Sequence, residues 1–67
     1  MQPSQPISAN LKQIRTQRGW SIADAAEATG FDADVLEGIE RGATFLSRAR
    51  TNDLADRLGV SLADLTG

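Results

Sequence analysis

The stretch "SIADAAEATGFDADVLEGIERG", residues 21–42, contains two short helical patterns separated by one glycine. Ser21 with Asp24 three residues later has the spacing of a capping box, in which each side chain bonds the other residue's backbone N–H. This spacing predicts a helix over 22–29. Gly30 follows directly, and glycine is the residue that most readily adopts the left-handed conformation at a helix end. The segment therefore predicts a helix that stops abruptly and turns.

A second helix is expected over 33–41, with Asp32 as its cap and Gly42 after its end. Its apolar residues recur at helical spacing and form one stripe: Val35, Leu36 and Ile39. A tight glycine turn thus joins two helices, each with an apolar side that needs a partner to cover it.

Helical signals continue on both sides of this pair. Spacings of four and three residues predict a first helix over 9–18, capped by Ser8, and Ser47 opens a helix that reaches Leu58. A last turn, "LADLTG", follows a second capping-box spacing. No strand-like alternation or internal repeat is present. We predict an all-α fold, a compact five-helix bundle with a helix-turn-helix, in which residues 1–6 form a flexible N-terminal arm and residues 7–67 the domain.

Composition excludes several classes of function. The chain has 67 residues and contains neither cysteine nor histidine, which removes disulfides, thiolate chemistry, the usual zinc sites and imidazole acid-base work. We therefore expect no enzyme, no cofactor and no metal site. No apolar run approaches a membrane span and "MQPSQPIS" lacks the features of a signal peptide, so a cytoplasmic protein without membrane contact is expected.

Charge is unevenly distributed along the chain, whose net charge is −2. Residues 1–21 carry cations only, whereas residues 22–40 carry acids only. The acids of this middle segment are Asp24, Glu27, Asp32, Asp34, Glu37 and Glu40. The two central helices are therefore predicted to be uniformly negative.

Several motifs resemble the helix-turn-helix domain of the phage repressor and Cro family, also called the XRE family. "LKQIRTQRGWS" is similar to the family's first helix and the entry to its second, "IERG" to the end of its third helix, and "LADRLGVSLADL" to the passage from its fourth helix to its fifth. Ala26 stands where the family has a small residue at a helix crossing, and Gly30 stands in the turn. The resemblance extends from Ile7 to Leu65.

The resemblance implies a structural ion pair between Arg15 of the first helix and Glu40 of the "IERG" ending. The alternative is that both are ordinary solvated charges. A partly buried pair would fix the orientation of two helices more than it would add net stability.

The resemblance also implies that the third helix enters the DNA major groove. The residues at its groove-facing or partner-facing positions are Asp32, Ala33, Asp34, Glu37 and Gly38. Carboxylates accept hydrogen bonds from cytosine but repel phosphate, and the family's common glutamine after the second helix's cap is replaced by Ile22. The acids have a structural reading too, as favourable charges at a helix start and as a Glu37–Arg41 pair. A calcium loop is a poor match, because the remaining oxygen ligands are missing.

Cations after the third helix supply the expected contacts to the DNA backbone. Arg48 and Arg50 lie in the first turn of a helix, where the dipole disfavours positive charge, so an external anion is an attractive explanation. The full set predicted to contact phosphate is Ser21, Arg41, Thr44, Arg48 and Arg50. Trp20 is expected in the core, and Ile22 either packs inward or forms an apolar spot for a protein partner.

Two functions compete. The first is a small transcriptional regulator that binds double-stranded DNA, as a homodimer, with an unusually acidic recognition helix. The second is an antirepressor-like or cytoskeletal-adaptor-like module that has lost DNA binding and holds a basic protein partner. "SIADAAEAT" and "VLEGIE" also resemble the N-terminal helix-turn-helix domain of RodZ, which binds the actin-like MreB, but Arg50 and Leu54 stand where its aromatic residues would be.

Overall fold

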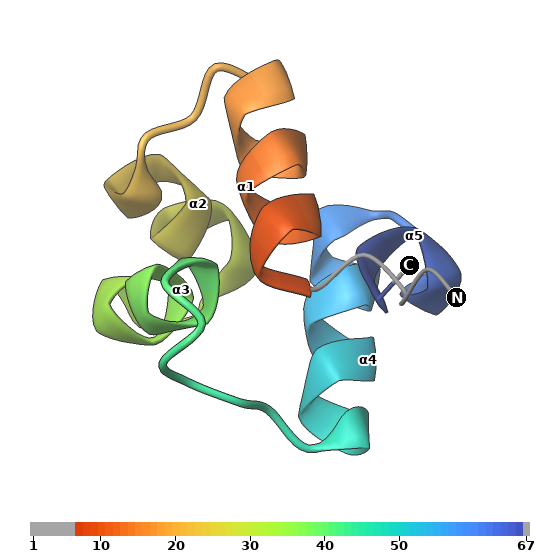
Figure 1. Ribbon diagram of the computed structural model, residues 1–67. Helices are drawn as coiled ribbons and strands as arrows, with labels where there is room; N and C mark the ends of the chain where they lie inside the picture. The colour runs from red at the N-terminus through yellow and green to blue at the C-terminus, as the bar shows by residue number, and fades with distance from the viewer. Residues whose placement is uncertain (1–6, 67) are drawn as a thin grey trace.

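The computed structural model describes residues 7–66, and this part of the chain forms five helices and no strand (Figure 1). The helices are α1 (Ile7–Gln17), α2 (Ile22–Thr29), α3 (Ala33–Glu40), α4 (Arg48–Leu58) and α5 (Leu62–Thr66). The predicted all-α, five-helix architecture is confirmed. None of these helices has the length and apolar character that crossing a bilayer requires.

Local capping bonds set most of the helix limits. At the start of α2 the Ser21 hydroxyl accepts from the Asp24 N–H at 3.0 Å, and the Asp24 carboxylate accepts from the Ser21 N–H at 3.1 Å. Ser47 caps α4 by accepting from the Arg50 N–H at 3.2 Å. The capping box predicted before α5 is also formed. Each bond satisfies an N–H group that has no partner within its helix.

Three details of the prediction are wrong. Helix α1 begins at Ile7, so Ser8 lies inside its first turn and is not its cap. Helix α3 ends at Glu40, and Arg41 is its C-cap. Asp32 occupies the N-cap position of α3, but its side chain makes no capping hydrogen bond, so its charge can favour the helix only through the dipole. The expected arm, residues 1–6, lies outside the described residues.

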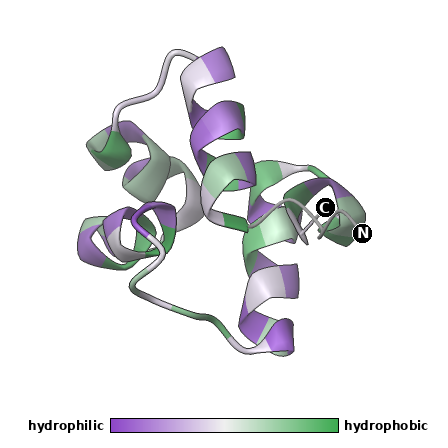
Figure 2. Cartoon of the chain, in the orientation of Figure 1, coloured by the Kyte–Doolittle hydropathy of each residue, from purple (hydrophilic) through white to green (hydrophobic). Residues whose placement is uncertain are grey.

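All five helices contribute to one core, together with Phe31 in the turn between α2 and α3. The buried apolar residues are Leu11, Ala25, Phe31, Leu36, Ile39, Leu54, Ala55, Leu58 and Leu65. Figure 2 shows hydrophilic and hydrophobic segments mixed along the helices, as expected for helices with one buried side. Trp20 and Ile22 both pack against this core, so Trp20 is placed as predicted and Ile22 takes the inward alternative.

The arrangement of the helices leaves one side of α3 uncovered. Helix α1 packs against α3 and α5, α2 packs against α3 and α4, and α4 packs against α5. In Figure 1, α2 and α3 occupy one half of the molecule and α4 and α5 the other, with α1 between them. The Asn10 amide of α1 donates to the Leu65 carbonyl of α5 at 2.8 Å, which fastens the first helix to the last.

Candidate nucleic-acid interface

Gly30 makes the turn between α2 and α3. Its φ of 76° lies in the left-handed region, which costs residues with a Cβ roughly 1–2 kcal/mol. The Gly30 N–H donates to the Ala26 carbonyl, and the Thr29 hydroxyl accepts from the Phe31 N–H at 3.2 Å. Phe31, the residue after Gly30, is buried. The turn is thus short and fixed, and it holds α3 at a set angle to α2.

The start of α2 has little free capacity for phosphate. Ser21 is exposed, but its backbone N–H is already bonded to the Asp24 carboxylate. That carboxylate also places a negative charge in the first turn of α2. The hydroxyl of Ser21 accepts a bond from Asp24 and keeps its own hydrogen to donate. Any contact from Ser21 to phosphate would therefore run through the hydroxyl.

The uncovered side of α3 is acidic. Asp32, Asp34 and Glu37 are exposed, and Arg41 after the last turn is exposed as well. Ala33 is half-buried. Within residues 7–66 the ion pairs are Arg15–Glu40 and Arg57–Asp53, so the expected pair of Glu37 with Arg41 is not formed. Three carboxylates and one guanidinium thus face outward from this helix and its ends.

Gly38 does not belong to that outward surface, which corrects the prediction. It is buried, and a Cβ added there would clash with the side chain of Thr44. The Gly38 carbonyl also accepts from the N–H groups of Ala43 at 2.8 Å and Thr44 at 3.1 Å. The loop after α3 therefore folds back over Gly38, and the absence of a side chain is what lets it approach.

Arg15 and Glu40 form the predicted ion pair. The Arg15 Nε donates to Glu40 Oε2 at 2.7 Å, and Nη2 donates to Oε1 at 2.9 Å. Nη1 donates to the Trp20 carbonyl at 2.8 Å. The hydrogen bonds that Arg15 donates to the Glu40 carboxylate raise the pKa of Arg15, while burial acts in the opposite direction. One guanidinium therefore joins α1, the loop before α2 and the end of α3.

Arg50 reaches toward the start of α3. Its guanidinium lies 5.1 Å from the centre of the Phe31 ring, within the range of a cation–π contact. The sequence did not predict this contact, because Phe31 and Arg50 lie far apart in the chain and belong to different elements. The contact holds the Arg50 guanidinium beside the start of the acidic helix α3, where it could bind a phosphate next to that helix.

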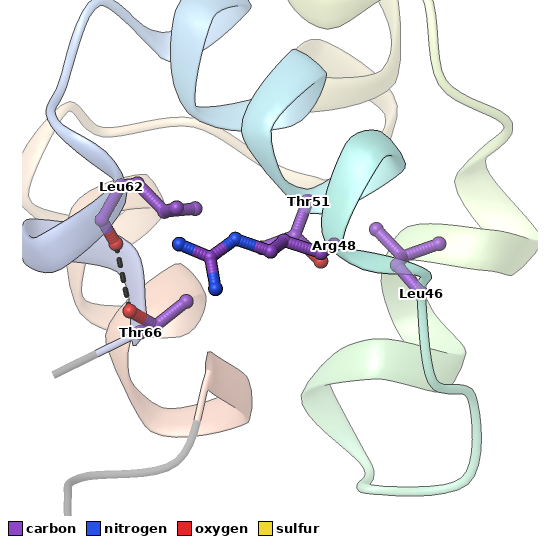
Figure 3. A pocket seen from close by; sticks show the side chains of 5 residues that line it. All are labelled: Leu46, Arg48, Thr51, Leu62 and Thr66. Atoms are coloured by element: carbon purple, nitrogen blue, oxygen red, sulfur yellow. Dashed lines mark hydrogen bonds between the residues drawn. The ribbon is translucent and has the colours of Figure 1, made fainter.

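Arg48 is not brought together with Arg50. Figure 3 shows its side chain running from the start of α4 toward Leu62 and Thr66 of α5. Arg48 therefore lies on the α4–α5 side of the molecule, and the predicted set of backbone contacts divides into two groups. Thr44, also in that set, is half-buried against Gly38.

Arg57, which the sequence analysis did not single out, stabilises the turn between α2 and α3. The Arg57 Nη1 of α4 donates to the Thr29 carbonyl at the end of α2 at 3.0 Å, and its Nε pairs with Asp53 at 3.2 Å. A cation at a helix C-terminus is favourable. Arg57 thus connects α4 to the turn that orients α3.

The site is suited to contacts with a macromolecular surface. Over the described residues there is no group of histidine, cysteine, aspartate or glutamate side chains that would hold a metal ion. The site can make hydrogen bonds and charge interactions through the exposed side of α3, which follows the Gly30 turn.

Comparisons with known proteins give the same fold. Residues 7–66 match the family described as "Helix-turn-helix domain". The chain is 43% identical over 54 residues to the HTH-type transcriptional regulator SutR of Escherichia coli, a match that covers 81% of this chain and 30% of that protein. The chain thus spans about a third of the length of this curated relative.

Solved structures agree. An HTH_3 family transcriptional regulator from Vibrio cholerae matches with a TM-score of 0.81 and 32% identity, covering 88% of this chain and 33% of that one. The restriction-modification controller protein C.AhdI from Aeromonas hydrophila matches with a TM-score of 0.78 and 29% identity, covering 88% of this chain and 89% of that one. With its five helices, its glycine turn and its Arg15–Glu40 pair, this chain belongs to the helix-turn-helix domain family of the Cro and XRE type.

Proposed function

We propose that this domain binds double-stranded DNA as the DNA-binding part of a transcriptional regulator, without enzymatic activity and in the cytoplasm. The observation that carries the proposal is the exposed α3, presented by a rigid glycine turn on a fold that transcriptional regulators share over 88% of this chain. In this geometry α3 would lie in the major groove and the start of α2 would face the backbone.

Contacts to phosphate would come from four of the five predicted residues. Arg50 is held beside the start of α3 by Phe31, and Arg41 is exposed at the other end of that helix. The hydroxyls of Ser21 and Thr44 would add bonds without charge. Arg48 is left out, since its guanidinium points toward α5.

The acids of α3 would limit both affinity and choice of sequence. Carboxylates near phosphates oppose the electrostatic attraction that supplies most non-specific binding. Asp34 and Glu37 can still accept from the amino group of cytosine, so any base contact they make would favour C·G pairs. We therefore propose that non-specific binding to DNA is weak and that contacts to bases contribute more to the affinity than the electrostatic attraction to phosphate does.

The test is a fluorescence anisotropy titration of labelled duplex DNA, repeated at several salt concentrations. Two arginine contacts predict that log K falls against log salt with a slope of about −2, because each neutralised phosphate contributes about −0.9. Absence of binding to random-sequence and genomic duplexes at low salt, in protein shown to be folded, would reject the proposal.

A second candidate is supported by the charge of α3. Three exposed carboxylates against one arginine make a surface that would suit a basic protein partner. Charge reversal by Asp34→Lys with Glu37→Lys separates the two proposals. It should strengthen binding to DNA if DNA is the ligand and abolish capture of a basic partner if a protein is.

A further inference from the structure

Helix α4 presents two arginines to the turn between α2 and α3. Arg50 and Arg57 are seven residues apart, which is about two helical turns, so both lie on one side of α4. Leu54 lies between them on that side and is fully buried. The Arg50 guanidinium lies over the Phe31 ring, and Arg57 Nη1 donates to the Thr29 carbonyl. One arginine of α4 therefore holds the residue before the turn glycine, and the other holds the residue after it.

The bond from Arg57 completes the C-terminal end of α2. Thr29 is the last residue of this helix, so its carbonyl has no donor within the helical ladder. The Thr29 hydroxyl is already used, since it donates to the Ala25 carbonyl at 2.8 Å and accepts from the Phe31 N–H at 3.2 Å. A Cβ placed on Gly30 would lie 3.0 Å from Arg57 Nη1. The guanidinium thus lies against the backbone at the point where the chain changes direction.

Asp53 orients the Arg57 side chain. Its carboxylate, four residues earlier on the same helix, accepts from Arg57 Nε at 3.2 Å. About half of each side chain is exposed, and an exposed ion pair adds little to stability. The pair does fix direction, because Nε is held by Asp53 while Nη1 is held by the Thr29 carbonyl.

We propose that Arg57, oriented by Asp53, is a positioning residue for DNA recognition and sets the angle between α2 and α3. The inference rests on the proposed function, because this angle matters for binding only if α3 enters the major groove. Contacts to bases depend on how α3 lies in the groove, whereas contacts to phosphate carry no sequence information directly. Loss of the Arg57 bond should therefore reduce the preference for one DNA sequence over another far more than the general attraction to DNA.

The first experiment measures the angle in the full chain without DNA. Residual dipolar couplings of the backbone N–H bonds report the orientation of each helix. In Arg57→Met, which keeps an apolar stem and removes every donor, the α3 couplings should no longer fit the wild-type orientation, whereas those of α4 and α5 should. Lys12→Met removes a cation from an exposed position of α1 and is the control, whose couplings should fit throughout. Unchanged α3 couplings in Arg57→Met would overturn the proposal.

The second experiment measures sequence preference. Duplexes are selected from a random pool with the wild type, and fluorescence anisotropy compares one selected duplex with a random-sequence duplex at several salt concentrations. Circular dichroism verifies that each variant is folded at the temperature used. Arg57→Met should lower the ratio of the two affinities about tenfold, which is the discrimination that one well-placed base contact supplies. Its salt slope should equal that of the wild type, and Lys12→Met should keep the wild-type ratio.

Two further variants test the geometry of the guanidinium. Arg57→Lys retains the charge and one donor group but cannot hold Asp53 and Thr29 in the same way, so its loss of preference should be smaller than that of Arg57→Met. Asp53→Ala should also lower the ratio, because Arg57 Nε loses its acceptor. A wild-type ratio in Asp53→Ala would overturn the part given to Asp53.

The outcomes separate this proposal from the proposed function. A salt slope that falls in magnitude by about 0.9 in Arg57→Met would show that Arg57 itself contacts a phosphate, and the positioning role would be rejected. An Arg57→Met variant that discriminates between the two duplexes as the wild type does would reject that role as well, while the proposed function stands. A wild type that binds no duplex would reject the proposed function, and with it any role of Arg57 in reading DNA.

Discussion

Arg15 and Glu40 are joined by two parallel hydrogen bonds of 2.7 and 2.9 Å, although they are 25 residues apart in the chain. Their side chains retain only 14% and 9% of their exposed surface. The pair connects α1 to the last residue of α3, so the orientation of α3 depends on a contact at its C-terminal end. Fork-to-fork geometry of this kind fixes direction as well as distance.

Removal of one partner should be costly. Glu40→Ala leaves the Arg15 guanidinium without its acceptor, and we expect a loss of about 2 kcal/mol in the free energy of unfolding, as for hydrogen bonds to charged groups. Urea denaturation measures this loss. The exposed pair of Arg57 with Asp53 is the control, since Asp53→Asn should cost less than about 1 kcal/mol. Equal losses in both variants would contradict the role given to Arg15 and Glu40.

Gly38→Ala should destabilise the domain although alanine is the better helix former. The gain in helix propensity is about 1 kcal/mol, but the new Cβ clashes with the Thr44 side chain, and overpacking of this kind costs about 1–3 kcal/mol. A net loss of about 1 kcal/mol is expected from these opposing effects. Thr44→Ala added to Gly38→Ala should recover stability in thermal melts, and failure to recover it would show that the clash is not the cause.

Neutralising the acids of α3 should strengthen binding to DNA. Asp34→Asn with Glu37→Gln removes two negative charges from the exposed side of that helix and should raise affinity for random-sequence duplex about tenfold at low salt, an effect that shrinks as salt screens it. Asp56→Asn on α4 is a control for a change in charge on another helix. A loss of binding in the α3 variant would instead assign the carboxylates to direct contacts with bases.

Arg50 should act through Phe31. Arg50→Ala is expected to weaken binding to all duplexes alike and to lower the magnitude of the salt slope by about one, because one phosphate contact is lost. Phe31→Leu keeps an apolar side chain in the core but removes the ring beneath the guanidinium, so DNA affinity should fall while Arg50 is still present. A Phe31→Leu variant that is stably folded and binds DNA like the wild type would show that the ring contact does not position Arg50.

Much of the fold was predictable because its signals are local. Capping boxes at Ser21 and Ser61 and the glycine at the end of α2 act over three or four residues, so their spacing in the chain is also their spacing in the structure. The helical spacing of Leu36 and Ile39 likewise predicted a buried side of α3 correctly. The Arg15–Glu40 pair was predicted only from resemblance to a family, since nothing local links two residues on separate helices.

The sequence by itself thus determined the helices, the turn and the acidic character of α3. Tertiary structure decided which of the predicted site residues face outward together. Gly38 is covered because the following loop folds back on it, Arg50 is drawn to Phe31, and Arg48 is directed to α5. Each of these outcomes depends on a contact between segments that belong to different elements. The spacing of residues along the chain predicts which side of a helix a residue lies on, but it does not predict such contacts.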